Sequence, residues 1–422
     1  MKKILTSIAL TTAVFATNDY SQFANQFNGD YQNYQQQTQT QFNSYKKALD
    51  DGFKEYKASL DKEFKNYKKS LGKYWNNPEL STKTTFVEYS QDKKTKKKVD
   101  YDKGEITIQV ISKDKFDAQK TLAKALISLS VENTKTAFNN NPVLTKVNKQ
   151  LSSNPKLKQV IKTTQPSNEP IVTDLIFKKP PTKKDVVNYA IQQVKTKPIQ
   201  VQTSKVPKMN VYTIKIKLPS RAFLAKAKIY KQDVLKRAKQ FNLTPEFIYG
   251  IIHTESSFNP MARSYVPAFG LMQLVPRTAG ADAYKMLYGK SKILTPSFLY
   301  NAHNNILMGS AYLKRLYYGY MKRIKNPVSR LYCSIAAYNT GAGNVACAFN
   351  STSKDYKGRT KCIRSRGDYN IIKASSKINQ LTPQQVYNRL LSNLRYDEAK
   401  NYLKRVSKRM QIYHKALNTN AL

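Results

Sequence analysis

An apolar pattern repeats every eleven residues near the N-terminus, and it constrains the fold more than any other feature of the chain. The repeated positions are Phe42, Phe53 and Phe64, then Tyr45, Tyr56 and Tyr67, then Leu49, Leu60 and Leu71. Eleven residues complete three turns at about 3.67 residues per turn, so a nearly straight helix keeps them all on one face. We therefore predict a long amphipathic helix over residues 17–77, about 80 Å long if unbroken. Gly29 and Gly52 weaken this helix, and Pro78 marks its end.

The aromatic stripe of this helix needs a partner surface, and the sequence leaves two alternatives open. The stripe can pack on the protein's own body or on a second copy of the chain. It can instead lie in a membrane interface, aromatic face down with lysines at its flanks, which would be a peripheral membrane contact. The sequence indicates no oligomeric state.

The charge of the chain limits its partners. The 422 residues include 72 Lys and Arg against 27 Asp and Glu, which gives a formal net charge of +45. Such an excess calls for polyanionic surroundings: nucleic acid, anionic lipid or an acidic cell-wall polymer.

The N-terminus selects among these partners. Lys2 and Lys3 precede a mostly apolar run over residues 4–15 that is followed by Ala16, the pattern of a signal peptide over residues 1–16. We therefore expect an exported protein, periplasmic or associated with the cell envelope, and no nucleic-acid partner. Because no Cys occurs before Cys333, we expect no lipid anchor and hence not a lipoprotein.

Residues 78–218 carry a mixed pattern that is typical of a small α+β domain. The expected strands are 84–90, 99–101, 105–111, 171–177 and 210–218, and the expected helices are 115–138 and 184–193. The basic stretch 93–98 is predicted to be a solvated hairpin loop. We find no catalytic constellation here, since the carboxylates are scattered and the region has no His.

Residues 219–422 are helical throughout by pattern and predict an independent all-α domain. The expected helices are 223–241, 245–257, 302–320, 328–339, 383–394 and 397–416, separated by Pro, Gly and Asn signals. The predicted fold class is therefore mainly α: an all-α C-terminal domain preceded by a small α+β domain and a long N-terminal helix.

Glu255 is the strongest candidate for a catalytic group. Thr244 can cap a helix beginning at Pro245, and Ile248, Ile251 and Ile252 precede Glu255 by seven, four and three residues, so they share its face. A buried carboxyl with no cation beside it has a raised pKa and stays protonated near neutral pH, which is what a general acid needs. The local pattern alone also fits a Glu at the end of an apolar face that reaches back to water.

The three Cys all lie in the last part of the chain. Cys347 and Cys362 flank a polar, Lys-rich segment, and in an oxidising compartment we expect them to form a disulfide. Cys333 lies among apolar residues and is predicted to be a buried thiol.

Four ordered motifs resemble the soluble-lytic-transglycosylase family. They are Glu-Ser-Ser-Phe-Asn-Pro at 255–260, Phe-Gly-Leu-Met-Gln at 269–273, Ala-Tyr-Asn-Thr-Gly-Ala-Gly at 337–343 and Glu-Ala-Lys-Asn-Tyr at 398–402. The last motif has Lys where that family usually has Arg. The resemblance covers roughly residues 225–415. The preceding region resembles, in pattern more than in residues, the N-terminal domain of the transglycosylase C group, which is usually lipid-anchored.

The resemblance implies a lysozyme-like domain that cleaves the MurNAc–GlcNAc β-1,4 bond of peptidoglycan glycan strands without water. Glu255 would protonate the glycosidic oxygen and then accept the proton of the MurNAc C6 hydroxyl, which attacks C1 to give a 1,6-anhydro ring. The residues support this independently. A two-carboxylate glycosidase needs a second acid about 5–9.5 Å away, but no acid lies between Glu255 and Asp282, nor between Asp282 and Asp355. An intramolecular hydroxyl has a high effective molarity and needs no second carboxylate.

The resemblance also implies roles for further side chains. Ser264 would bond near Glu255 and the sugar, and Gln273 would contact the glycan. Tyr338 and Asn339 would line the cleavage site, and Tyr402 would orient the catalytic carboxyl. Glu398 shares a helix face with Tyr402 and is either a sugar ligand or a structural acceptor.

Other chemistries have little support. His253, His303 and His414 lack metal-ligand spacing, so we expect no metal and no cofactor. Three alternatives stay open: a hydrolytic muramidase using Asp282 or a water positioned by Ser264, a non-catalytic peptidoglycan-binding scaffold, and, if the leader is misidentified, a nucleic-acid binder.

Overall fold

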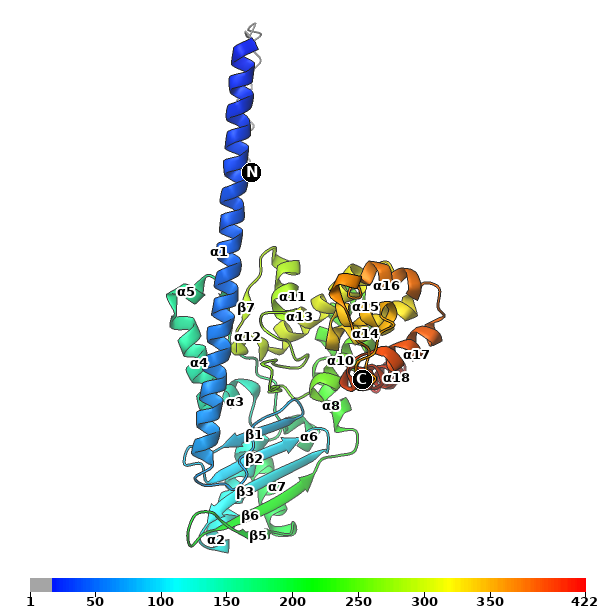
Figure 1. The fold of residues 1–422 in the computed structure, drawn as a ribbon. Coiled ribbons are helices and arrows are strands. Elements are labelled where there is room, and N and C mark those ends of the chain that lie inside the picture. The colour runs from blue at the N-terminus through cyan, green and yellow to red at the C-terminus, as the bar shows by residue number, and fades with distance from the viewer. Residues whose placement is uncertain (1–16) are drawn as a thin grey trace. The chain divides into compact units, whose positions relative to one another are not determined.

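The computed structural model describes residues 17–422 and is mainly α-helical (Figure 1). The predicted signal peptide, residues 1–16, lies outside the described residues. The chain divides into two compact units between Asp51 and Gly52, so the helix α1 (Thr17–Leu71) contributes to both. Within residues 17–422, no helix combines the length and apolarity needed to cross a bilayer.

The helix α1 confirms the long-helix prediction, although it ends at Leu71, before Pro78. In its second part, the stripe residues Tyr56, Leu60 and Phe64 are buried. Polar contacts hold this part too, because Ser59 donates to Gln150 at 2.7 Å and Asn154 donates to Glu55 at 3.0 Å. From Gly52 to Leu71, therefore, the stripe packs on the protein's own body.

Gly52 does not break the helix and instead permits a close approach. A Cβ at this position would lie 2.7 Å from Cδ2 of Leu157, inside van der Waals contact. In the first unit, Phe27, Tyr31, Tyr34 and Phe42 are exposed. For this part the membrane interface stays a prediction.

A five-stranded antiparallel sheet forms the centre of the α+β region. Its order is β1 (Thr85–Tyr89), β2 (Thr95–Asp100), β3 (Glu105–Ser112), β6 (Asn210–Lys217) and β5 (Gln200–Thr203). Helix α2 (Lys115–Ser130) packs on β2 and β3 and against α7 (Lys183–Thr196). The inward side chains of β3, among them Ile106 and Ile108, are completely buried. The strands at 84–90, 105–111 and 210–218 and the helix at 184–193 were correctly predicted, whereas the strand expected at 99–101 begins at Thr95.

The prediction of a solvated loop at residues 93–98 is wrong, because most of this basic stretch is strand β2. Lys97 is buried and forms ion pairs with Glu132, at 2.9 Å, and with Glu88. Burial alone would lower the pKa of Lys97, but these two carboxylates raise it. Lys96 and Lys98 both pair with Glu79. Acidic side chains from distant segments therefore make a lysine-rich strand compatible with burial.

Three further predictions for this region fail in part. The helix expected at 115–138 is interrupted, because Asn133 caps a separate helix, α3 (Thr134–Asn140). The segment 171–177 contains a short helix, α6 (Thr173–Ile176), and not a strand. Strand β5 was not predicted. The intervening chain forms α4 (Pro142–Ser153), α5 (Pro155–Lys158) and β4 (Ile161–Lys162).

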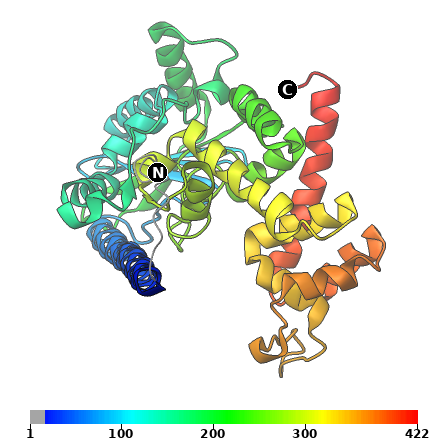
Figure 2. The same cartoon turned by 90° about the horizontal axis from the view of Figure 1, so that it is seen from above.

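The C-terminal region is helical, as predicted, and Figure 2 shows its last helix, in red, alongside other helices of the region. The correctly predicted helices are α10 (Pro245–Ser256), α14 (Pro327–Thr340), α17 (Pro383–Asn393) and α18 (Asp397–Asn418). The unpredicted ones are α11 (Ala279–Tyr288), α12 (Pro296–Leu299), α15 (Ala342–Asn350) and α16 (Ile371–Ile378). A 3-10 turn (Arg364–Arg366) precedes α16.

Two predicted helices are each divided. Residues 223–241 form α8 (Ala222–Ile229) and α9 (Lys231–Phe241), which meet at Tyr230. Residues 302–320 form α13 (Ala302–Lys314) and a π-helical continuation (Arg315–Tyr320). The two-residue strand β7 (Ile293–Leu294) pairs in parallel with β4 and joins the two regions. The predicted fold class is confirmed, whereas the domain boundaries at 77 and 218 remain predictions.

Candidate active site

Helix α10 positions Glu255 at the buried end of an apolar helix. Pro245 occupies the first turn, where its missing N–H costs nothing. Thr244 is at the capping position, as expected, but its side chain makes no capping bond. Every residue from Phe247 to Ser256 is buried, and α18 packs along α10.

The carboxyl of Glu255 lies where its protonated form is favoured. The residue is 5% exposed, and burial raises the pKa of the carboxyl above its usual value. The C-terminal end of a helix carries partial negative charge, which disfavours a carboxylate there as well. The local environment therefore supports the predicted general acid.

A cation lies beside this carboxyl, contrary to the expectation from sequence. Nζ of Lys83 is 3.4 Å from Oε2 of Glu255, and the lysine side chain is 40% exposed. Lys83 lies just before β1 in the α+β region, 172 positions away in the chain. Its ammonium group counteracts burial by lowering the pKa of Glu255. This contact could not be predicted from the sequence, because a partly exposed lysine before a strand is an ordinary feature.

Two tyrosines and one acid interact with Glu255. The hydroxyl of Tyr402 is buried and approaches the carboxyl, where it lowers the pKa of Glu255. It has no hydrogen-bond partner of good geometry among residues 17–422. The hydroxyl of Tyr338 donates to the carbonyl of Met272 at 2.7 Å, and its pKa is raised by burial and then by the nearby Glu255. Glu398 is exposed, and its charge raises the pKa of Glu255. The structure thus places Tyr338, Tyr402 and Glu398 near the carboxyl of Glu255.

The Gly270–Gln273 segment is fixed by a buried asparagine that sequence reasoning missed. Asn305 accepts from the amide of Met272 at 2.8 Å and donates to the carbonyls of Phe269 and Leu299, at 2.9 and 2.8 Å. Gly270 has a φ of +75°, and a Cβ there would lie 2.3 Å from Nδ2 of Asn305. Only glycine fits this turn.

Gln273 is held in this turn as a partly unsatisfied polar group. It is buried with a φ of +47°, and its Nε2 donates to the carbonyl of Gly270 at 3.1 Å. Its buried Oε1 accepts no hydrogen bond from the described residues. That free acceptor is compatible with the predicted contact to a sugar hydroxyl.

Ser264 and Asn339 are less closely tied to Glu255. The Ser264 hydroxyl donates to the carbonyl of Val266 and accepts from the amide of Ala268, so its hydrogen bonds stay within its own loop. Asn339 is half-buried on α14, beside Tyr338. Their roles towards a sugar stay predictions.

The chain just after Glu255 is strained and anchored to the α+β region. Ser257 and Phe258 both have left-handed backbone conformations, with φ of +49° and +62°, which costs about 1–3 kcal/mol each for residues other than glycine. Ser257 donates to Asp102 at 2.6 Å, and Asn259 donates to the carbonyl of Lys83 at 3.3 Å. The α+β region therefore holds both ends of this turn and places Lys83 at the carboxyl.

The histidine two positions before Glu255 belongs to an aromatic cluster. His253 is buried between aromatic rings, and its Nδ1 is 2.9 Å from the hydroxyl of Tyr413. Burial and the neighbouring Arg409 lower its pKa to about 3, so the ring is neutral. No cluster of three or more potential metal ligands occurs in the described part of the chain.

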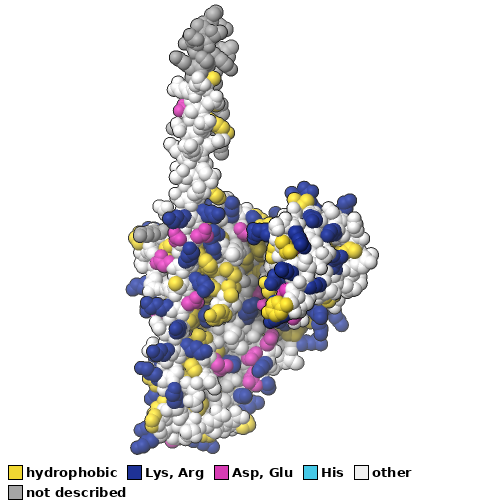
Figure 3. All heavy atoms as spheres, in the orientation of Figure 1, with side chains coloured by type: hydrophobic (Ala, Val, Ile, Leu, Met, Phe, Trp, Pro, Cys, Tyr) yellow, Lys and Arg dark blue, Asp and Glu magenta, His cyan; other side chains and the backbone are white. Residues whose placement is uncertain are grey.

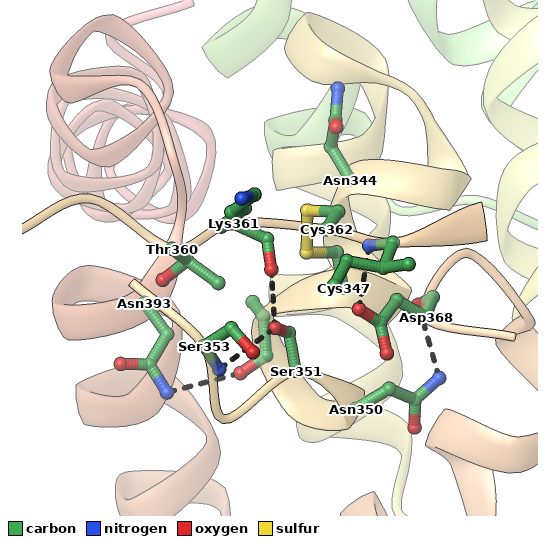
Figure 4. The surroundings of a disulfide bond; sticks show 12 residues. Asn344, Cys347, Asn350, Ser351, Ser353, Thr360, Lys361, Cys362, Asp368 and Asn393 are labelled. Atoms are coloured by element: carbon green, nitrogen blue, oxygen red, sulfur yellow. Dashed lines mark hydrogen bonds between the residues drawn. A yellow bond between two sulfur atoms is a disulfide. The ribbon is translucent and has the colours of Figure 1, made fainter. Parts of the chain in front are cut away.

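Cys347, which is buried on α15, and Cys362 form a disulfide (Figure 4). Their Cα atoms are 5.8 Å apart, and the bond joins positions 15 apart in the sequence. Asp368 supports the same loop by accepting from the amide of Ile363 at 2.7 Å. Cys333 is a buried thiol.

Residues 233–359, which include Glu255, match the model of the transglycosylase SLT domain. The chain is similar to membrane-bound lytic murein transglycosylase C. It is 36% identical to the protein of Actinobacillus pleuropneumoniae serotype 5b over 230 residues, 54% of this chain and 56% of that one. It is 39% identical to the protein of Haemophilus influenzae over 183 residues, 43% of this chain and 46% of that one. The chain thus spans about half the length of the curated relatives it matches.

Two solved structures also show similarity. One is an inactive mutant of lytic transglycosylase Slt from Pseudomonas aeruginosa, 24% identical, with a TM-score of 0.33 over 45% of this chain and 24% of that chain. The other is the 70 kDa soluble lytic transglycosylase from Escherichia coli, 22% identical, with a TM-score of 0.32 over 44% and 24%.

Proposed function

We propose that this protein is a peptidoglycan lytic transglycosylase that acts in cell-wall remodelling. The observation that carries the proposal is the setting of Glu255, a buried carboxyl inside a matched SLT domain. The relatives named as lytic murein transglycosylases support the same substrate.

In the proposed reaction, one carboxyl serves twice. Protonated Glu255 gives its proton to the oxygen between MurNAc C1 and GlcNAc, and the C1–O bond breaks. The resulting carboxylate accepts the proton of the MurNAc C6 hydroxyl, whose oxygen bonds to C1 and closes the 1,6-anhydro ring. No water is consumed, and Glu255 ends protonated. The ammonium of Lys83 stabilises the carboxylate that exists between the two transfers.

The surroundings of Glu255 favour this reaction over hydrolysis with two carboxylates. Glu398, an acid whose charge affects the pKa of Glu255, is exposed at the start of α18. Asp282 on α11 pairs with Arg315 at 3.7 Å. Asp282 and a positioned water are therefore both left as alternatives for a muramidase.

The envelope is the location that fits this substrate, and the relatives are named as membrane-bound. Basic side chains are spread over the face shown in Figure 3 and suit an anionic cell wall. We further propose that residues 219–422 are the catalytic domain and that the α+β region supports it through Lys83 and Asp102.

Product analysis tests the proposal. Digestion of purified sacculi followed by mass spectrometry should give 1,6-anhydroMurNAc ends, lighter by one water than the reducing ends of hydrolysis. Glu255→Gln should yield neither product. Reducing ends from the wild-type protein would establish the muramidase, and unchanged digestion by Glu255→Gln would assign the activity elsewhere.

A further inference from the structure

A groove of 970 Å³ opens beside the candidate active site, in the unit that contains it. Its walls are the last turns of α1, the segment from Pro78 to Thr85, and the loop from Arg263 to Tyr265. Lys83 lines this groove and also contacts Glu255 at 3.4 Å. A substrate with its scissile bond at Glu255 would therefore have neighbouring groups at the mouth of the groove.

The groove is cationic. Five basic side chains line it: Lys65, Lys68, Lys83, Lys98 and Arg263. Its two acids already have partners: Asp61 pairs with Lys57 at 2.7 Å, and Glu79 pairs with Lys96 and with Lys98 of the groove itself.

Three of these cations form no ion pair within the described part of the chain, although the charge of Asp61 acts on one of them, Arg263. Lys65 and Lys68 are exposed on α1, and neither forms an ion pair with a described residue. Arg263 is half-buried, and its guanidinium carbon stacks 3.4 Å from the ring centre of Phe64. Its backbone amide is tied to the carbonyl of Thr82 at 3.1 Å, which fixes the base of the side chain.

A stacked guanidinium with unused N–H groups is suited to planar carboxylates, which it binds with two parallel hydrogen bonds. The nearby Lys65 and Lys68 add positive charge and can bind a carboxylate in many orientations. In peptidoglycan, the group next to the scissile bond that carries carboxylates is the peptide attached to MurNAc. Charge and position therefore indicate the same occupant.

We propose that this groove binds the carboxylates of the stem peptide carried by the sugar at the cleavage site. This inference rests on the proposed function. It assigns Arg263, Lys65 and Lys68 as specificity residues that favour peptide-bearing strands over bare glycan.

The test compares two substrates: peptide-bearing glycan strands, and the same strands after enzymatic removal of their peptides. For each protein, the ratio of kcat/KM on the first to kcat/KM on the second measures the preference for peptide. The double variant Lys65→Ala/Lys68→Ala should lower this ratio about three- to tenfold, as expected for two solvent-exposed charge contacts. The matched control Lys62→Ala/Lys69→Ala removes two exposed charges from the same helix that do not line the groove, and it should keep the ratio.

Two results would contradict peptide binding in the groove. One is an unchanged ratio of kcat/KM values in Lys65→Ala/Lys68→Ala. The other is an equal fall of this ratio in both double variants, which would indicate general attraction to polyanions. Binding measured in the Glu255→Gln background separates this inference from the proposed function. If the wild-type protein makes no anhydro product, the activity is wrong. A selective loss of binding to peptide-bearing strands in Lys65→Ala/Lys68→Ala/Glu255→Gln would still support the groove.

Discussion

The α+β region and the helical region each bury a carboxyl next to a lysine, with different consequences. Glu132 is 3% exposed, and its partner Lys97 is equally enclosed and touches a second carboxylate, Glu88. Burial raises the pKa of Glu132 to about 8. Glu255 is similarly buried, but its partner Lys83 is 40% exposed and borders a groove. The Lys97–Glu132 ion pair is closed to solvent and can serve only the fold. The Lys83–Glu255 ion pair is open on one side, where a substrate can exchange a proton with the carboxyl.

Replacing each of the two buried carboxyls, Glu255 and Glu132, should have the most different effects on activity. Glu255→Gln should reduce anhydro-product formation by about 10³-fold or more, because it removes both the acid and the base. Glu132→Gln, the matched control, should keep kcat close to the wild-type value. Initial rates on sacculi check this, and a comparable loss in both variants would remove the distinction.

Replacing the lysine partners of these carboxyls, Lys97 and Lys83, should lower the free energy of unfolding by different amounts. Lys97→Met leaves Glu88 and Glu132 buried without their cation and should lower the free energy of unfolding by about 3–5 kcal/mol. Lys83→Met removes a partly exposed cation and should cost less than about 1 kcal/mol. Urea unfolding of both variants measures the difference. Equal losses would mean that Lys83 is also a structural residue.

Tyr402→Phe should have a smaller effect, confined to the catalytic side of the comparison. The Tyr402 hydroxyl lowers the pKa of Glu255. Without this hydroxyl, kcat should fall about tenfold, because one polar group beside the Glu255 carboxyl is lost. The free energy of unfolding should change little, because the hydroxyl makes no well-formed hydrogen bond within residues 17–422. A large loss of stability with normal kcat would contradict this role.

The smallest effect is a change in pH dependence. Lys83 holds the pKa of Glu255 below the value that burial alone would give. In Lys83→Met, the carboxyl should therefore stay protonated to higher pH, and the alkaline limb of kcat/KM against pH should move upwards. The groups facing Glu255 that could also titrate are Tyr402, Tyr338 and Glu398. Lys83→Arg should restore the wild-type profile, and an unmoved limb in Lys83→Met would exclude this electrostatic role.

The buried position of Glu255 could be predicted from the sequence because its signal is local. The isoleucines three, four and seven positions before Glu255 place its carboxyl on the buried face of one helix. The long helix was equally accessible, since the eleven-residue repeat specifies its period. Both predictions needed only neighbours along the chain.

The predictions that failed depended on contacts between distant segments. Local composition predicts that the lysine-rich segment around Lys97 is solvent-exposed. In the structure it is a strand, and Glu79, Glu88 and Glu132 form ion pairs with its lysines. Lys83 reaches Glu255 across 172 positions, and the chain between them gives no indication of it. The strand predicted at 171–177 failed for another reason. Val172 precedes the helix α6 but has no capping side chain, so the sequence carries no helix-start signal there.

In the proposed reaction, one buried carboxyl closes a ring without using water, and isotope incorporation detects any water that takes part. Sacculi digested by the wild-type protein in H₂¹⁸O should yield anhydroMurNAc ends that contain no ¹⁸O. Products carrying ¹⁸O at C1 would show that water attacks the sugar and would rule out ring closure by the C6 hydroxyl.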